Sequence, residues 1–209
     1  MDNNAPRLAR LIEVLRQGEV LAARTALRQS GMAPASWMRR ALAVQAAQER
    51  NHAAIAGIAV RMLGAAAGTA RHTPDVIADL RLQLDRDLDA GALACSMIGL
   101  QGIVEHLGEA VLERLGRHPH PAGAVLHALR NKVLAQEHGH VLLGSRCLQA
   151  LGHPPAHAEK LHHYRELGRS TAMRVAELVD DARFDAHAFW CDIDARLTDW
   201  HHRAQAAQD

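Results

Sequence analysis

The sequence predicts an all-α protein, and three observations support that fold class. Hydrophobic residues make up 48% of the 209 residues, which is enough to bury a core, but aromatic residues make up only 3%. Ala, Leu and Arg are abundant whereas Val, Ile and Thr are sparse, and this bias favours helices over strands. Apolar residues recur at helical spacing, and no segment alternates as a strand would. A β-sandwich or β-barrel is therefore not expected.

Helix start and stop signals place the first two helices. Pro6 suits the first turn of a helix that we expect to run to about Ser30, where Gly31 follows. Ser36 is a good N-cap for a second helix that reaches about Leu63. Because the break between these helices is short, we expect them to form an antiparallel hairpin.

Similar signals divide the rest of the chain. The sequence Thr73-Pro74-Asp75 is expected to open a short helix inside a long connection, residues 64–90. The later predicted helices span about residues 91–116, from the turn at 118–121 to 152, 157–180 and 185–205. No linker is long enough to mark a domain boundary. We therefore expect one domain over residues 1–209, with a core bundle of about residues 6–151 and C-terminal helices in about residues 155–205.

Charge and cysteine content narrow the functional classes. The formal net charge is +1, with 24 basic and 23 acidic residues, so the whole chain offers no general field for a nucleic acid or a membrane. No apolar run has the length of a membrane span, and Met1–Asn4 do not resemble the start of a signal peptide. Cys95, Cys147 and Cys191 are odd in number and lack the CxxC spacing. Reduced thiols in a cytoplasmic protein are expected.

Histidine is unusually frequent, and three Glu-x-x-His motifs occur. Glu49/His52 and Glu137/His140 lie in the second and fourth long helices, whereas Glu159/His162 lies near the start of a C-terminal helix. Residues three apart share a helix face, so each motif can offer a carboxylate and an imidazole to one metal ion. With 15 histidines the spacing alone is weak evidence, because it also arises by chance.

The position of each motif on its helix separates the three. One apolar stripe reads Leu42, Gln45, Glu49, His52, Ala56, Ala59 and Leu63, and the other reads Val133, Glu137, His140, Gly144, Cys147 and Leu151. Glu159 instead shares its face with charged residues, as on a solvated surface. A buried ionised glutamate is costly unless it is paired or binds a metal. The two motifs on apolar stripes therefore predict a metal site.

The same criterion selects one glutamate on each of the other two long helices. Glu19 lies on the apolar stripe of the first helix and Glu105 on that of the third, whereas Glu13 points outward. The chain thus presents Glu, Glu-x-x-His, a long crossover, Glu and Glu-x-x-His. This is the ligand order of a carboxylate-bridged dinuclear metal site in a four-helix bundle.

The chain therefore resembles the ferritin-like superfamily of non-haem di-iron proteins. The resemblance is carried by Glu19, Glu49, His52, Glu105, Glu137 and His140 over roughly residues 6–151. It implies a ferritin-like four-helix bundle, with a long crossover between the second and third long helices and additional C-terminal helices. Demethoxyubiquinone hydroxylases and di-iron tRNA hydroxylases are similar in helix length and in their extra helices, and the sequence does not select between them.

The resemblance also implies a chemistry. The six residues would bind two iron ions, or manganese, because mixed carboxylate and imidazole ligands suit these metals. An iron pair would use O₂ to oxidise or hydroxylate an organic substrate, either a small molecule or one bound to a carrier. An electron donor is expected, and the sequence allows a homodimer. Glu137, together with Glu49 or Glu105, is expected to bridge the ions.

Two further expectations concern the surroundings of the metals. Gln45 and Gln101 precede ligands on the same stripes, so they either orient the imidazoles or are polar residues at the core edge. Small residues such as Ala56, Gly102 and Gly108 either leave a substrate cavity or permit close helix packing.

Two other functions remain open on sequence grounds. One is a ferroxidase or peroxide-handling iron protein without an organic substrate, and the other is a metal-free helical module that binds a partner. The residues beyond the fourth long helix favour the enzyme, because a minimal ferroxidase bundle needs fewer helices to enclose its site.

Overall fold

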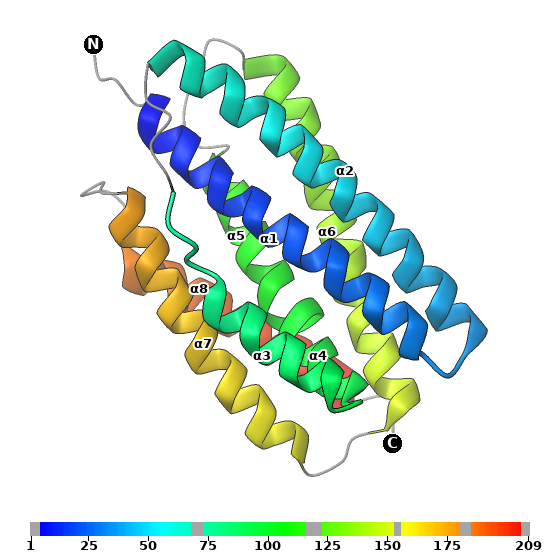
Figure 1. Cartoon of the computed structure of the whole chain (residues 1–209). Helices are drawn as coiled ribbons and strands as arrows, with labels where there is room; N and C mark the ends of the chain where they lie inside the picture. Colours follow the sequence, from blue (N-terminus) through cyan, green and yellow to red (C-terminus); the bar gives the residue numbers. More distant parts are fainter. Residues whose placement is uncertain (1–4, 68–72, 116–122, 153–155, 180–184, 206–209) are drawn as a thin grey trace.

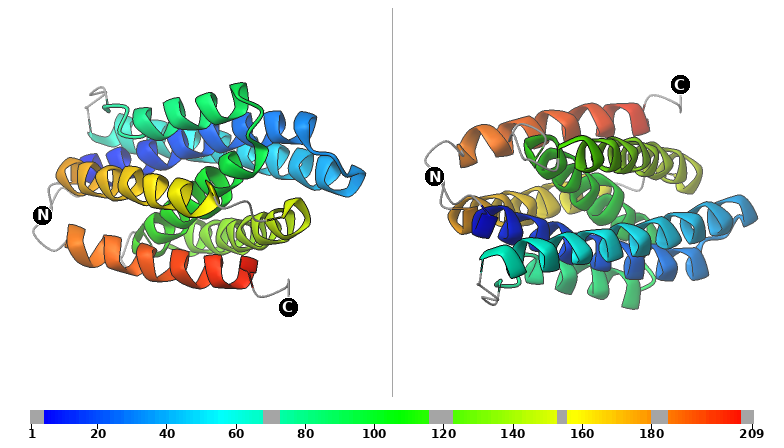
Figure 2. Two further views of the ribbon diagram at one scale, coloured as in Figure 1. Left: turned by 90° about the horizontal axis from the view of Figure 1, so that it is seen from below. Right: turned by 90° about the horizontal axis from the view of Figure 1, so that it is seen from above.

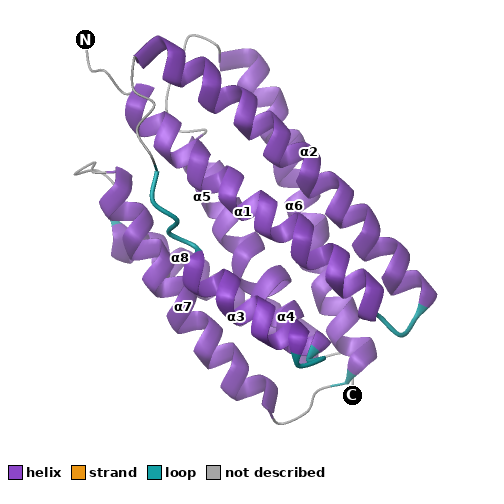
Figure 3. Cartoon of the chain, in the orientation of Figure 1, coloured by secondary structure: helices purple, strands orange, loops and turns teal. Residues whose placement is uncertain are grey.

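A computed structural model describes residues 5–67, 73–115, 123–152, 156–179 and 185–205. Every regular element in these ranges is a helix (Figure 3). The helices are α1 (Ala5–Met32), α2 (Ser36–Ala67), α3 (Ala78–Asp89), α4 (Leu93–Met97), a π-helix (Ile98–Val104), α5 (Glu105–Leu115), α6 (Gly123–Leu151), α7 (Ala156–Val179) and α8 (Ala186–Gln205). The all-α prediction is confirmed.

Most predicted helix limits agree with the structure to within a few residues, and α3 is the clearest difference. It begins at Ala78 rather than at the predicted Thr73-Pro74-Asp75 signal. Val76 and Ile77 instead form a turn whose side chains are buried in the core, and no side chain caps the helix. Burial of these two residues outweighs the local capping signal. The predicted turn at 118–121 lies outside the described residues.

The third long helix of the bundle is not a regular α-helix. It consists of α4, the π-helix and α5 in direct succession, and all seven residues of the π-helix are buried. Two of its glycines lie against aromatic rings, since a Cβ atom at Gly99 would be 2.4 Å from Tyr164 and one at Gly102 would be 2.9 Å from Trp200. The π-helix ends where Glu105 begins α5, so it sets the position of a predicted ligand.

The core bundle is formed by two antiparallel helix pairs. α1 and α2 form a hairpin, and the α4–α5 segment pairs with α6 (Figure 1). Between the pairs, the connection returns the chain along the bundle and contains α3, as the predicted long crossover requires. The four-helix arrangement with a crossover between the second and third long helices is confirmed.

The C-terminal helices cover the side of the bundle away from α2. α7 packs on α1 and on the π-helix, and α8 packs on α5, α6 and α7 (Figure 2). Trp200 of α8 is almost fully buried, and its indole N–H donates a hydrogen bond of 2.9 Å to the carbonyl of Val141. These contacts make both helices part of the wall around the bundle core.

Two simpler expectations can be compared with the structure. Cys95, Cys147 and Cys191 are all free thiols. None of the described helices is both long enough and apolar enough to cross a membrane.

Candidate metal centre

The six predicted ligands meet at one level inside the four-helix bundle. Glu19 comes from α1, Glu49 and His52 from α2, Glu105 from the first residue of α5, and Glu137 and His140 from α6. Each of the six side chains belongs to a residue that is 5% exposed or less. The apolar stripes of the four helices therefore bring together the residues that the sequence predicted.

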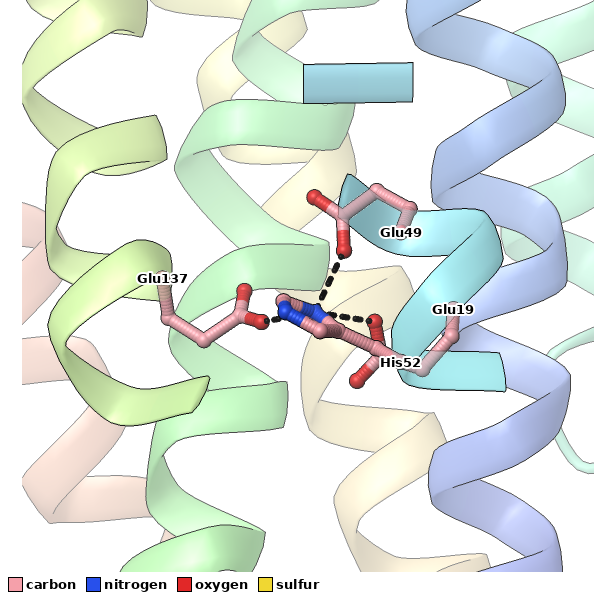
Figure 4. A group of neighbouring side chains, drawn as sticks. All are labelled: Glu19, Glu49, His52 and Glu137. Atoms are coloured by element: carbon pink, nitrogen blue, oxygen red, sulfur yellow. Dashed lines mark hydrogen bonds and ion pairs between the residues drawn. The ribbon is translucent and has the colours of Figure 1, made fainter. Parts of the chain in front are cut away.

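One half of the cluster surrounds the imidazole of His52. Its Nδ1 atom lies 3.3 Å from Glu19 Oε2, 3.1 Å from Glu49 Oε2 and 3.0 Å from Glu137 Oε1. These four side chains point toward one another from three helices (Figure 4). They offer a cation three carboxylates and one imidazole nitrogen.

The other half surrounds His140 in the same way. Its Nδ1 atom lies 2.7 Å from Glu49 Oε1, 3.6 Å from Glu105 Oε2 and 3.6 Å from Glu137 Oε2. The two imidazole rings are 6.4 Å apart between centroids. The site therefore has two similar halves, each with one histidine.

Glu49 and Glu137 belong to both halves and direct one oxygen to each. Glu19 lies only beside His52, and Glu105 lies only beside His140. The geometry thus favours Glu49 and Glu137 as bridging carboxylates, with Glu19 and Glu105 as terminal ligands. The sequence had left the choice between Glu49 and Glu105 open.

Without metal, the four carboxyl groups titrate differently. Burial raises the pKa of Glu19 and of Glu105 well above the ordinary value, and the neighbouring carboxylates raise both further. Burial has the same effect on Glu49 and Glu137, but hydrogen bonds with neighbouring side chains, the two histidines among them, outweigh it and lower both pKa values. Glu49 and Glu137 are therefore the more acidic pair, and Glu19 and Glu105 hold a proton more tightly.

The pKa values of the two histidines are raised by the same contacts that lower those of Glu49 and Glu137. Burial opposes their charging, but the surrounding carboxylates raise the pKa of His52 well above its ordinary value and that of His140 to about 12. Two imidazolium ions thus balance the ionised Glu49 and Glu137. With two divalent cations bound, four carboxylates and two neutral imidazoles would be equally balanced.

Metal loading should therefore release protons. The two imidazolium ions must each lose a proton, and so must Glu19 and Glu105 to the extent that their raised pKa values keep them protonated. We therefore expect release of roughly two to four protons per two divalent ions at neutral pH. Because ions and protons compete for the same atoms, affinity should rise as pH rises. Anaerobic titration with Mn(II) in a pH-stat measures the release, and a value near zero would contradict this proton count.

Several details fit a bound ion better than an empty hydrogen-bond network. Among the described residues, Glu137 Oε1 and His140 Nδ1 are buried without a hydrogen bond of acceptable geometry. Each nevertheless has an oppositely charged neighbour within 3.0 Å. The ligand atoms of each half lie within 4.8 Å of one another, and buried polar atoms without a well-formed hydrogen bond are rare in proteins. The oxygen and nitrogen donors suit iron or manganese.

The outer nitrogens of both histidines are held by glutamines that the sequence analysis missed. His52 Nε2 lies 2.8 Å from Gln136 Oε1, and His140 Nε2 lies 2.8 Å from Gln48 Oε1. Each Nε2–H donates to an amide oxygen, so Nδ1 is the nitrogen that would bind a metal once it has lost its proton. Gln48 directly precedes Glu49 on α2, and Gln136 directly precedes Glu137 on α6. Each glutamine therefore comes from the helix opposite the histidine that it holds. The repeated Gln-Glu-x-x-His sequence was the available signal.

Gln45 and Gln101 have a different role from the one considered on sequence grounds, because neither contacts an imidazole. Gln45 donates to Glu105 Oε1 at 2.7 Å, and Gln101 donates to Gln45 Oε1 at 3.0 Å. Gln101 also donates to Gln29 Oε1 at 2.9 Å, and Gln29 in turn donates to Ser96. This buried amide chain orients the carboxylate of Glu105 rather than a histidine.

Replacing Gln48 or Gln136 by leucine should weaken metal binding by about 10- to 100-fold. Each change removes the acceptor that fixes one imidazole and leaves its N–H without a partner. Gln149→Leu is the matched control, because Gln149 is also half-exposed on α6 but donates its hydrogen bond to the carbonyl of Arg203 and not to a ligand. Competition with a metal chelator gives the affinities, and equal losses in all three variants would contradict this role.

A cavity of about 50 Å³ adjoins the carboxylate side of the cluster. Three of its lining residues are predicted ligands, namely Glu19, Glu105 and Glu137. The remaining walls come from apolar residues of α1, α3, the π-helix, α5 and α7, apart from the hydroxyl of Thr171. Neither histidine ligand lines the cavity, and no residue of α2 does, so the cavity opens on the side of the cluster away from the imidazoles.

The predicted cavity beside Ala56, Gly102 and Gly108 is therefore only partly correct. Gly108 lines the cavity, but Ala56 and Gly102 do not. Gly102 permits close packing of Trp200, and Gly144 does the same for Gln101, whose Cβ would be 2.3 Å from an added Cβ atom. Thr171 on α7 could not be found from the motif, because it lies outside the four helices that carry the ligands.

Comparisons with known proteins identify the fold. No protein-family model matches the chain, and no curated protein matches its sequence. Among solved structures, the chain is similar to one from Synechococcus described as Protein 19 with aldehyde deformylating oxidase activity. The TM-score is 0.78 at 15% sequence identity, and the alignment covers 98% of this chain and 92% of that one. The chain therefore has the ferritin-like fold, a helical bundle around a buried carboxylate and histidine cluster.

Proposed function

We propose that this protein is a di-iron enzyme that uses O₂ to oxidise an apolar organic substrate. Glu49 and Glu137 would bridge two iron ions, Glu19 and His52 would complete one position, and Glu105 and His140 would complete the other. The observation that carries this proposal is the sharing of Glu49 and Glu137 between two half-sites, each with its own histidine.

The side chains around the ions would have separate tasks. Bound iron would supply the O₂ activation and redox chemistry that amino-acid side chains lack. The bridging carboxylates would fix the spacing of the two positions, and the glutamines would fix the histidine tautomers. Gln45 would hold Glu105 on the cavity side, where its carboxylate faces the space left for a substrate.

The cavity supports an organic substrate rather than free iron as the molecule to be oxidised. Its walls are mainly apolar and its volume is about 50 Å³, so it would hold the reacting end of a hydrocarbon chain and exclude water from the reacting atoms. Thr171 is buried and is the one polar side chain among the described lining residues that is not a proposed ligand. Its hydroxyl would donate a hydrogen bond to an oxygen atom of the substrate and so fix its orientation.

An aldehyde is the substrate class that we propose to test first. The similar Synechococcus protein is described as having aldehyde deformylating oxidase activity. An aldehyde combines an apolar chain with one oxygen acceptor, which matches the apolar walls and Thr171. Its carbonyl group would point toward Glu19 and Glu105.

The test combines metal analysis with O₂ consumption. Protein from iron-replete cells should contain close to two iron ions per chain. After anaerobic chemical reduction, O₂ uptake should depend on added n-alkyl aldehydes of graded chain length, with an oxidised organic product. Oxidation of many Fe(II) equivalents per chain without any effect of aldehydes would instead indicate a ferroxidase. Folded protein that binds no metal would refute the proposal.

Gly108→Leu should reduce aldehyde-dependent O₂ uptake on the order of 100-fold without loss of iron. A Cβ atom at Gly108 meets nothing within 4 Å, so the larger side chain enters the cavity instead of displacing a helix. Gly31→Leu is the control, because that glycine is exposed and far from the cavity. Unchanged uptake in Gly108→Leu would show that substrate binds elsewhere.

A further inference from the structure

The α2 and α6 helices carry a strong local positive charge that the balanced composition conceals. Within Ser36–Ala67 and Gly123–Leu151, the acidic residues are Glu49 and Glu137, both buried in the metal cluster. Exposed basic residues of these helices include Arg40, Arg50, Arg61, Lys132 and Arg146. We call the exposed side of the two helices the α2/α6 face.

These five charges have no ion-pair partner in the part of the chain that the structure describes. Surface arginines elsewhere on the chain commonly form ion pairs. Arg24 pairs with Asp85, Arg174 with Asp79 at 2.6 Å, and Arg169 with Glu166 at 3.0 Å. Positive charge without a neighbouring acidic side chain is therefore a feature of the α2/α6 face.

The same face also exposes apolar side chains. Trp37, Val44, Ile58 and Met62 of α2 and Leu142 of α6 are between 39% and 69% exposed. They lie among the basic residues, so the face offers apolar contacts with surrounding charges. This composition is typical of a surface that recognises a partner of opposite charge.

The α2/α6 face is also the short way from solvent to the metal ligands. Gln48 and Gln136 are half-exposed, and each lies one hydrogen bond of 2.8 Å from the ligand His140 or His52. The cavity, by contrast, is lined mainly from α1, α3, α5 and α7 on the other side of the cluster. The side of the cluster that faces the cavity is thus separate from the side that carries the two histidines.

We propose that the α2/α6 face docks an acidic one-electron carrier protein, which delivers electrons through the histidine side of the metal centre. This inference rests on the proposed di-iron function. Each carrier would give up one electron, so two encounters would supply the two electrons that a bound pair of ferric ions needs to become ferrous. Electron transfer weakens steeply with distance, which favours the face beneath which the two histidines lie.

Charge reversal provides the binding test. An acidic plant-type [2Fe–2S] ferredoxin and an acidic flavodoxin serve as probes, and basic cytochrome c serves as the oppositely charged comparison. The variant Arg40→Glu/Arg146→Glu should bind the acidic carriers at least about tenfold more weakly than the unaltered chain at low salt. The control Arg86→Glu/Arg169→Glu changes the net charge equally, outside α2 and α6, and should bind normally.

These measurements use protein with and without metal, so they do not depend on turnover. Binding of acidic carriers no tighter than that of cytochrome c would overturn the proposal, and so would equal losses in both variants. Association with phosphatidylglycerol vesicles in place of either carrier would assign the face to a membrane surface and would also overturn it.

A bypass experiment separates this inference from the proposed function. Stoichiometric dithionite, added without O₂ and consumed before O₂ is admitted, reduces the metal centre without a docked protein. Arg40→Glu/Arg146→Glu should therefore keep a single turnover of aldehyde after this treatment, measured as oxidised product, and lose turnover with reduced ferredoxin. Absence of product from the dithionite-reduced unaltered chain would refute the proposed function. Normal uptake with ferredoxin in the variant would refute only the docking site.

Discussion

Glu49→Ala or Glu137→Ala is expected to reduce the metal content from the proposed two ions per chain to less than one. Each of these glutamates directs one oxygen to each half of the cluster, so either change removes a ligand from both positions. Glu19→Ala should behave differently, because Glu19 lies beside His52 alone and the position at His140 keeps all its ligands. That variant should retain about one ion.

Surface variants complete this experiment. Glu13 forms a short-range pair with Arg16, and His162 is exposed on α7, so Glu13→Ala and His162→Ala should both retain two ions. Elemental analysis after gel filtration gives the counts, and circular dichroism checks that each variant remains helical. If Glu49→Ala lost only one ion, as Glu19→Ala should, the bridging role would be wrong.

The residues of the buried cluster could be predicted because their evidence is local. Glu19, Glu49, Glu105 and Glu137 each interrupt an apolar stripe with a period that follows from helix geometry alone. Their order along the chain, with one long crossover, then implies that the four stripes face a common interior. The structure confirms that these stripes converge. It also shows which carboxylates belong to both halves of the cluster, and this depends on distances between helices that the sequence of one helix does not reveal.

Other features depend on contacts between helices that the sequence does not specify. Gln48 and Gln136 lie on helix flanks, and their role becomes visible only when α2 and α6 are placed side by side. The cavity depends on Thr171 and its neighbours in α7, whose position is set by packing on the π-helix. The π-helix itself replaced an expected regular helix, because its wider turn is selected by tertiary packing rather than by residue propensity.

That packing leads to the second large expected effect, in which Gly99→Ala should destabilise the protein by about 3 kcal/mol. An added Cβ atom would lie 2.4 Å from Tyr164 Cζ and 2.7 Å from Leu84 Cδ2, both of which belong to fully buried side chains. The Tyr164 ring cannot easily move, because its hydroxyl donates a hydrogen bond of 2.8 Å to the buried Asp87. The π-helix would have to shift instead.

Gly108→Ala is the matched comparison, since an added Cβ atom there meets nothing within 4 Å. Replacing a helical glycine by alanine without a clash should raise stability by roughly 0.5–1 kcal/mol. Thermal unfolding of the metal-free proteins should therefore place Gly99→Ala below the unaltered chain by about 6–12 °C and Gly108→Ala slightly above it. Equal unfolding temperatures for the two variants would mean that the π-helix shifts easily to accept the added methyl group. Tyr164 would then not be what fixes the position of the π-helix beside Glu105.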